Sequence, residues 1–366
     1  MTEKTKSKIS ATIIADSRNE FGERITTFIL TCPRIIWAEL LTHRVFSRNA
    51  ASSRAIPYKK LCEAVKKDTF IPIAWQKNHK GMQGIEYHNE FNVKILNFLW
   101  KMSMRLTVFM SNLLSKFNAT KQLCNRLLEP YQWYTSIVTA TELDNFFKLR
   151  CPQYEMLDKD NKLVKFRSRK DVIANCIFPN QNEKFWRAVN KGQAEIHLMK
   201  LAECMWDAYN ESTPEILKEN EWHIPFKKLI QEQDIFLECG YDDSKDPWFA
   251  DFTSLQLGKL QTQLTLQVAT AMCARVSYTV VGDKDKKPNL KKDVELFKIL
   301  STSGHWSPFE HCAKTMSKEE YNKFIMGSPI KNTRPYIEDK KALGWCNNFK
   351  GFIQLRHYIE NGGINY

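Results

Sequence analysis

Residues 91–117 constrain the fold more than any other segment. Their sequence, FNVKILNFLWKMSMRLTVFMSNLLSKF, has the length and apolar spacing of one long amphipathic helix. Shorter helical patterns follow at 120–129, 139–150, 183–210, 256–277 and 292–303, and the last of these is followed by Gly304, a plausible C-cap. Helical patterns therefore account for much of the chain.

Two strands are predicted ahead of these helices. ISATIIAD (9–16) and ERITTFILT (23–31) alternate in polarity and are rich in β-branched residues, and Asn19 and Gly22 between them suit a hairpin turn. Pro33 then begins a predicted helix over 33–46, and the polar segment SRNAASSRAIP ends at Pro57. Strands combined with long helices indicate the α/β (α+β) class.

The charge balance favours anionic partners. Lys and Arg number 54 against 41 Asp and Glu, a formal net charge of +13, and such a surface attracts nucleotides, nucleic acids and phosphorylated cofactors. A lysine-rich solvated surface is the plain alternative. The ten Cys are scattered without a C-x-x-C pair, and no signal peptide or membrane-length apolar run is visible. We therefore expect a cytoplasmic protein with reduced thiols that pack as small hydrophobic residues.

Two segments carry candidate chemistry. The first, THRVFSRNAASSR (42–54), places guanidinium groups among hydroxyl and amide side chains, a combination that suits a phosphate or an anionic heterocycle. A basic helix end stabilised by its own macrodipole is the structural alternative. The second, SGHWSPFEHCAKTM (303–316), holds two His and a Glu. Their spacing fits no common zinc pattern, and hydrogen-bonded loop histidines are the alternative.

Together these segments resemble the flavin-dependent thymidylate synthases, whose signature is R-H-R, seven residues, then Ser. Thr42-His43-Arg44 followed by Ser52 matches it except at the first position. The family's G-H-x-[ST]-P-[FL]-E-H segment is matched fully by 304–311. No P-loop, G-x-G-x-x-G, H-E-x-x-H or G-x-S-x-G motif competes with this interpretation.

Four further fragments resemble family segments. They are CARVSY (273–278), NRLLEP (125–130), NFFKLR (145–150) and GQAEI (192–196). The resemblance covers roughly 20–57, 120–150, 190–210 and 270–316, under half of the chain. It implies one catalytic unit over 1–366, with a core of 9–150 and 191–316, an insertion at 151–190 and a C-terminal extension at 317–366. Arg334, Asn348 and Arg356 in that extension either complete the active site or lie on the surface.

The sequence also departs from the family pattern. The G-H-x-S-P-F-E-H block normally precedes the R-H-R block and here comes last, as in a circular permutation, which is sterically reasonable where termini lie close together. Thr42 replaces an Arg, Glu39 replaces a Gln, and Ala50 replaces an acid. The stretch between Pro130 and Arg150 is three residues shorter than usual and lacks a recognisable Asn-Ala-Arg flavin contact. These changes affect which pyrimidine the site would bind and how a flavin would lie in it.

The resemblance implies an enzyme that converts dUMP to dTMP with FAD, methylenetetrahydrofolate and NADPH. It implies a small sheet with long helices, assembled as a homotetramer, in which 93–116 offers apolar surface for packing, although a monomer core also uses such surface. The implied residues for chemistry are Arg150, His43 and Arg44. Those implied for flavin are His43, Arg44, Asn49, Asn145, His305, Ser307 and Glu310. Those implied for the nucleotide are Glu39, Thr42, Ser52, Ser53, Arg54, Arg126 and Arg150.

Each implied role has a physical basis. Arg54 and Arg126 would hold the phosphate with the Ser52 and Ser53 hydroxyls. Arg150 would lie on the uracil edge and favour the N3 anion, because an opposite charge within ~4–6 Å lowers a pKa by ~1–3 units. Ser52 is interpreted as a ligand, since in this family reduced flavin replaces a covalent nucleophile. No metal ion is expected.

Three alternatives stay open. A related flavin and folate enzyme would use dCMP or form a hydroxymethyl product, because exchanging Gln for Glu39 at a base edge removes a donor and adds an acceptor, as cytosine requires. A nucleic-acid-binding homologue is suggested by the charge, the ten Trp and KFRSRK (165–170), although nucleic acid is not the expected partner. A catalytically inactive homologue is the third, because the first signature Arg is absent.

Overall fold

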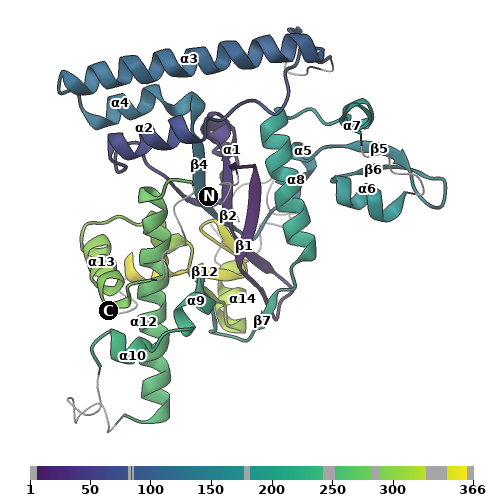
Figure 1. The fold of residues 1–366 in the computed structure, drawn as a ribbon. Helices are drawn as coiled ribbons and strands as arrows, with labels where there is room; N and C mark the ends of the chain where they lie inside the picture. The colour runs from purple at the N-terminus through teal and green to yellow at the C-terminus, as the bar shows by residue number, and fades with distance from the viewer. Residues whose placement is uncertain are drawn as a thin grey trace.

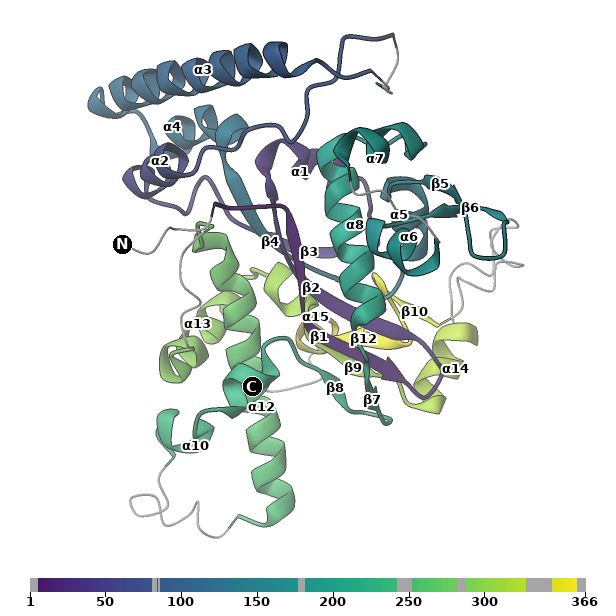
Figure 2. The same ribbon diagram turned by 45° about the vertical axis from the view of Figure 1, so that its right-hand side comes forward.

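The computed structural model describes residues 6–80, 84, 86–176, 182–241, 252–281, 288–326 and 344–360. At its centre lies a five-stranded sheet in the order β3-β4-β2-β1-β7 (Figures 1 and 2). All neighbours pair antiparallel except β7, which runs parallel to β1. The strands are β1 Ser10–Asn19, β2 Arg24–Pro33, β3 Ser47–Ala50, β4 Trp133–Ala140 and β7 Glu215–Leu217. A small, mainly antiparallel sheet with long helices confirms the predicted α/β class.

The predicted hairpin at β1 and β2 forms. Asn19 Oδ1 accepts hydrogen bonds from the backbone N–H groups of Phe21 and Glu23, and Gly22 has φ of +85°. Glycine adopts that conformation without a steric penalty, so the turn residues and the strand pattern specify the same structure.

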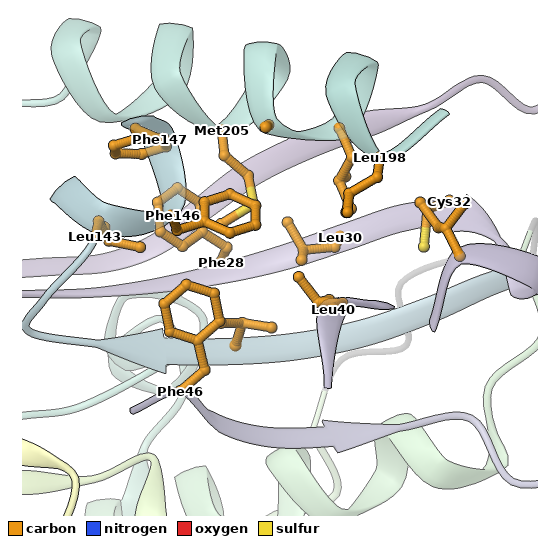
Figure 3. Packing of buried hydrophobic residues seen from close by; sticks show 14 of the residues in the cluster. Phe28, Leu30, Cys32, Leu40, Phe46, Leu143, Phe146, Phe147, Leu198 and Met205 are labelled. Carbon is orange, nitrogen blue, oxygen red and sulfur yellow. The ribbon is translucent and has the colours of Figure 1, made fainter. Parts of the chain in front are cut away.

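One face of the sheet carries the main apolar core (Figure 3). Phe28 and Leu30 of β2 point to this face and pack against α5 (Asp144–Arg150) and α8 (Ile196–Glu211). Helix α8 covers the sheet because its buried residues recur at helical spacing: Leu198, Leu201, Ala202 and Met205. Phe146 and Phe147 of α5 fill the space between that helix and the sheet.

The opposite face is covered by the C-terminal half of the chain. It includes α12 (Ser254–Arg275), η3 (Val276–Tyr278), α13 (Leu290–Thr302) and η4 (Ser307–Glu310). A three-stranded sheet β12-β9-β8 lies beside them, with β8 Trp222–His223, β9 Ala313–Thr315 and β12 Phe352–Gln354. Gly304 follows α13 with φ of +71°, which confirms it as the residue that ends that helix.

The remaining elements are short and peripheral. They are α9 Lys227–Gln231, α10 Ile235–Glu238, α14 Lys318–Met326, the hairpin β10 Trp345–Cys346 with β11 Phe349–Lys350, and α15 Leu355–Glu360. Within the described residues, no helix combines the length and apolarity needed to cross a membrane.

Helix α3 (Glu90–Lys116) matches the predicted long helix and begins at Asn89, whose side chain caps it. It lies with α2 (Tyr58–Lys67) and α4 (Lys121–Leu127) at one end of the molecule (Figure 1). Only Met104, Val108 and Ser111 of α3 are buried. Large apolar residues along it stay exposed: Phe91, Ile95, Phe98, Leu99, Met102, Leu106, Phe109, Met110, Leu113 and Leu114. The helix therefore packs along a narrow stripe and leaves a broad apolar face open.

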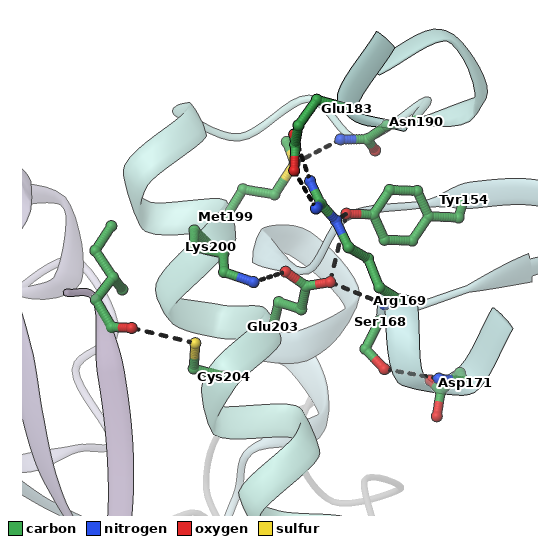
Figure 4. A network of polar contacts seen from close by, with 11 residues as sticks. Tyr154, Ser168, Arg169, Asp171, Glu183, Asn190, Met199, Lys200, Glu203 and Cys204 are labelled. Carbon is green, nitrogen blue, oxygen red and sulfur yellow. Dashed lines mark hydrogen bonds and ion pairs between the residues drawn. The ribbon is translucent and has the colours of Figure 1, made fainter. Parts of the chain in front are cut away.

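Residues 151–190 form a small layer of their own against α8. They contain β5 Tyr154–Leu157, β6 Leu163–Phe166, α6 Arg169–Asn175 and α7 Glu183–Val189; residues 177–181 lie outside the described part. Figure 4 shows how this layer is anchored. The buried Glu203 of α8 accepts from the Arg169 backbone N–H at 2.8 Å and from Lys200 Nζ at 2.6 Å. Its carboxylate is therefore fully satisfied, as a buried charge requires.

Three predicted helices are corrected. The one over 33–46 is only η1 (Arg34–Ile36) and α1 (Trp37–Leu40), because Phe46 is buried against Phe146 and draws the chain into β3. The one over 183–210 is broken because Asn190 Oδ1 accepts the backbone N–H groups of Gln153 and Gly192. The one over 139–150 begins at Asp144, because β4 continues through Ala140. In each case a tertiary contact overrides local preference.

Candidate active site

The stretch 39–56 is the centre of the candidate site, and four other predicted segments contact it: 125–130, 145–150, 273–278 and 304–311. It runs from α1 through a turn into β3, the edge strand that pairs with β4 in the register Ser47↔Thr139 and Asn49↔Ile137. Thr42 N–H and Oγ1 both donate to the Glu39 carbonyl, at 3.1 and 2.7 Å, which tightens the turn after α1. The signature residues thus lie on a turn and an edge strand, and not on a helix end.

The two signature segments, some 260 positions apart, lie side by side. Helix η4 packs against β3. Asn49 Nδ2 donates to the Cys273 carbonyl at 2.8 Å and Ser277 Oγ donates to Asn49 Oδ1 at 3.2 Å, so the 273–278 fragment joins the same strand. Both ends of the Asn49 amide are therefore occupied within the fold.

Arg150 at the end of α5 contacts the signature turn directly. Its Nε donates to His43 Nε2 at 3.1 Å, and its Nη2 lies 3.4 Å from Thr42 Oγ1. Burial, reinforced by the charges of Arg150 and Arg48, lowers the pKa of His43 to about 4. His43 is therefore a neutral imidazole whose Nε2 accepts, which assigns its proton to Nδ1.

Two acids and a second His extend this group. Glu195 of the GQAEI segment caps α8 by accepting from the backbone N–H groups of His197 and Leu198, and its Oε1 lies 2.5 Å from His197 Nδ1. His197 Nε2 accepts from the Ile73 N–H at 3.1 Å. Burial and the nearby charge of Glu195 raise the pKa of Glu39, while Arg150 and His197 oppose that rise. The sequence pattern does not single out Glu195 or His197, although the Glu-x-His spacing at a helix start is a usable signal.

The residues predicted for phosphate form a separate group where α4 meets the turn after β3. Asn125 Nδ2 donates to the carbonyls of Ser53 and Ile56, which fixes α4 on this turn. Ser52 Oγ accepts from the Arg54 backbone N–H at 3.2 Å, which leaves its own hydrogen for a ligand. Ser53 Oγ instead donates to Glu129 Oε1 at 2.5 Å. The hydroxyl of Ser53 must therefore turn away from Glu129 to donate to a phosphate.

The arginines at these two groups are free to meet an anion. Arg54 and Arg126 are exposed. Among the described residues, no carboxylate lies within ion-pair distance of four of them: Arg44, Arg54, Arg126 and Arg150. Unpaired guanidinium groups are suited to phosphates and anionic heterocycles.

The other residues predicted for flavin lie on the surface or form internal contacts. Arg44, Asn145 and Ser307 are exposed, and His305 Nδ1 lies 3.1 Å from Ser303 Oγ. Glu310 Oε1 accepts from Arg356 Nη1 at 2.6 Å. Across the part of the chain that the structure describes, no set of three or more His, Cys, Asp or Glu is placed to hold a metal ion.

The C-terminal extension packs on the same strand. Gln354 Nε2 donates to Ser47 Oγ at 2.9 Å, and Asn348 Nδ2 lies 3.3 Å from the same hydroxyl. With the Arg356–Glu310 pair, these contacts place Asn348 and Arg356 beside β3 and η4. Arg334 lies outside the described residues.

Beneath η4, a buried chain of hydrogen bonds crosses the sheet. Four bonds of 2.8–2.9 Å link five side chains in the order Ser17, His223, Thr27, Thr139 and His311. Burial lowers the pKa of both His223 and His311 to about 3, so both imidazoles are neutral. His311 Nε2 is buried with no partner among the described residues. The second signature His is therefore part of the sheet's interior and not a surface ligand.

All ten Cys are free, and eight of them are buried. Burial raises the pKa of Cys32 and Cys312 to about 12. The predicted packing of thiols as small hydrophobic residues is confirmed for those eight, and Cys32 and Cys312 are poor nucleophiles.

No protein-family model and no curated protein matches this sequence. Among solved structures, the chain is similar to the UMP/dUMP methylase PolB from Streptomyces cacaoi bound with 5-Br UMP, with 13% identity, a TM-score of 0.39, and coverage of 56% of this chain and 90% of that one. The same protein bound with 5-Br dUMP gives 11% identity, a TM-score of 0.39, and coverage of 56% and 92%. Functional inference therefore rests on the residues of the site itself.

Proposed function

We propose that this chain is a flavin-dependent thymidylate synthase-like enzyme that converts dUMP to dTMP with methylenetetrahydrofolate, NADPH and FAD. The observation that carries the proposal is that segments far apart in the sequence come together at residues 39–56. Four segments that resemble the family's binding segments contact residues 39–56: 125–130, 145–150, 273–278 and 304–311. Glu195 of a fifth, 192–196, is near enough to raise the pKa of Glu39. Chance matches scattered over 190 residues would have no reason to gather on one stretch.

A pyrimidine monophosphate is an anion, and two sets of arginines without carboxylate partners would bind it: Arg54 with Arg126, and Arg150 at the signature turn. Arg54 and Arg126 hold the phosphate, with the free hydrogen of Ser52 as a further donor. Arg150, positioned by His43 and Thr42, stabilises negative charge on the pyrimidine ring, because a guanidinium within hydrogen-bonding distance favours the N3 anion. The ionised ring is the better nucleophile at C5, so a fixed cation here is what the carbon transfer requires.

The donor set also fits a flavin dinucleotide. His43, Arg44, Asn145, His305 and Ser307 supply neutral and cationic donors around η4 and the signature turn. Glu310 and Asn49 act through the contacts that fix η4 and β3 in place. Reduced flavin, when bound, supplies the hydride that completes the methyl group. His43 is neutral, so the positive charge next to the bound flavin and pyrimidine would come from Arg44 and Arg150.

We also propose that the active assembly is a homo-oligomer, a tetramer by resemblance. The open face of α3 exposes ten large apolar side chains, and exposed apolar patches often mark protein–protein contacts. The proposed partners are therefore a pyrimidine monophosphate and further copies of this chain, in the cytoplasm.

The first test is the visible absorption spectrum of the purified protein before and after anaerobic addition of NADPH. We expect a yellow protein that bleaches, and dTMP formation from dUMP and methylenetetrahydrofolate. A colourless protein that FAD does not reconstitute would contradict the flavin part of the proposal. A reducible flavoprotein that forms no dTMP would contradict the substrate part alone.

Glu39 favours one second candidate, an enzyme that acts on dCMP. An ionised Glu39 accepts from the cytosine amino group, whereas a protonated one donates to a uracil carbonyl as Gln does. Burial and the charge of Glu195 raise the pKa of Glu39, which disfavours the ionised form that accepts from cytosine. We therefore expect Glu39→Gln to retain dUMP turnover within about threefold.

The comparison is the ratio of kcat/KM for dUMP and dCMP in the wild type and in Glu39→Gln, with formation of methyl and hydroxymethyl products measured for both. Preference of the wild type for dCMP, lost or reversed in Glu39→Gln, would replace dUMP by dCMP in the proposal.

A further inference from the structure

A cavity of about 510 Å³ lies outside the candidate active site, and none of residues 39–56 lines it. Five parts of the chain form it: residues 6–9 before β1, the end of α2 with the segment after it, α3, the start of β4, and α8. None of the residues predicted for nucleotide or flavin lines it. Its volume falls within the ~300–1,000 Å³ range of small-molecule sites.

The rim of this cavity is strongly cationic. Six lysines line it, with Asp68 as the single carboxylate: Lys6, Lys8, Lys66, Lys67, Lys101 and Lys200. Lys200 pairs with Glu203, and Asp68 Oδ2 accepts from the Ser7 backbone N–H at 2.8 Å. The other five lysines have no carboxylate within ion-pair distance among the described residues. Like charges gathered without partners repel one another, so an anion at the rim would relieve that repulsion.

The floor is apolar and contains one unsatisfied donor. Ile9, Ile71 and Ile73 line it together with Trp133. The Trp133 indole N–H is buried and has no hydrogen-bond partner among the described residues. A buried donor without an acceptor costs about 1–3 kcal/mol, so an indole that turns its N–H toward an acceptor on a bound ligand would remove that cost.

We infer that this cavity binds a nucleoside triphosphate. Five unpaired ammonium groups match the several charges of a triphosphate, since lysine is a compact point charge for phosphate. The apolar floor accepts a flat heterocycle, and the Trp133 indole would turn to donate its N–H to a ring nitrogen or carbonyl of that heterocycle. A monophosphate would leave most of the lysines unpaired. This inference is independent of the proposed function, because it uses none of the same residues.

The test is isothermal titration of the full-length protein with ATP in the presence of saturating dUMP, which fills the proposed active site. We expect saturable binding that weakens as salt rises. The double variant Lys66→Ala/Lys67→Ala removes two exposed rim charges and is expected to weaken ATP binding at least about tenfold. The matched control Lys59→Ala/Lys116→Ala removes the same net charge from α2 and α3 outside the cavity, and is expected to change it less than about twofold.

Trp133→Phe tests the floor separately, since it removes the N–H and keeps an aromatic ring. It is expected to weaken ATP and to leave inorganic tripolyphosphate unchanged, with a thermal melt to show that the variant is folded. Absence of ATP binding, or equal loss in both double variants, would overturn the inference. Tripolyphosphate binding as tightly as ATP would overturn the nucleoside part. Displacement of ATP by a short single-stranded oligonucleotide of much higher affinity would assign the surface to nucleic acid instead.

Discussion

Arg150→Ala is expected to lower kcat/KM for the pyrimidine nucleotide by about 10²–10³-fold, the usual effect of removing one preorganised electrostatic donor. Arg150 is the cation that the fold holds against the signature turn, with His43 and Thr42 as its hydrogen-bond partners. Arg150→Lys keeps the charge but not the planar fork, so it is expected to recover only part of the activity. Steady-state kinetics is expected to give kcat/KM values that fall from the wild type to Arg150→Lys to Arg150→Ala.

A second readout separates chemistry from folding. The charge of Arg150 contributes to the low pKa of His43, after burial, so the His43 pKa measured by NMR is expected to rise in Arg150→Ala. Lys148→Ala, exposed on the same helix, is the control and should leave both quantities unchanged. Activity of Arg150→Ala within about threefold of wild type, in a folded protein whose His43 pKa has risen, would exclude Arg150 from the reaction.

The second large effect is acid sensitivity from two buried histidines. His223 and His311 are fully buried and neutral, with pKa values lowered by burial to about 3 from an ordinary 6.5. Between those two values the unfolded chain binds protons that the folded chain does not. Stability therefore rises with pH through this window and falls as pH is lowered from 6.5 toward 3.

These two histidines are expected to lower stability by about 3 kcal/mol between pH 6.5 and pH 5. Each costs about 1.4 kcal/mol per pH unit well below pH 6.5, and about half of that at pH 6.5 itself, where the unfolded histidine is only half protonated. This interval isolates the histidines, because carboxylates that ionise ordinarily contribute mainly below about pH 5. Denaturant unfolding at several pH values between 7.5 and 5 measures the slope. The denaturant concentration at the midpoint of unfolding should be nearly constant above pH 7.5.

Two variants test whether the buried histidines cause the loss of stability at low pH. His43, whose pKa is lowered to about 4, contributes to the same slope. His223→Gln removes one of these three sites and is expected to reduce the slope by about a third, at some cost in stability at pH 7 from the disturbed chain of hydrogen bonds. His305→Gln changes an exposed histidine and should leave the slope unaltered. A stability profile that is flat from pH 7 to pH 5, or one that His305→Gln alters as much as His223→Gln does, would refute the assignment.

The elements that the sequence determined are those stabilised within a short stretch of chain. The β1–β2 hairpin follows from β-branched strands joined by Asn19 and Gly22, and α3 follows from its apolar spacing and the Asn89 cap. Gly304 ends α13 for an equally local reason. The signature segments were also recognisable, because their residue types and spacing survive in the sequence whatever surrounds them.

Only the tertiary structure decided where these segments lie and what their side chains do. Phe46 leaves the predicted helix for β3 because Phe146, a hundred residues later, buries it. His311 belongs to a signature segment but points into the sheet, toward Thr139, while Glu310 of the same segment pairs with Arg356 from the C-terminal extension. The lysines that line the 510 Å³ cavity come from segments far apart in the sequence. Strand register determines which side chains share a face, and shifting it by one residue reverses every one of them. Such pairings depend on the packing of the whole chain, so no local pattern specifies them.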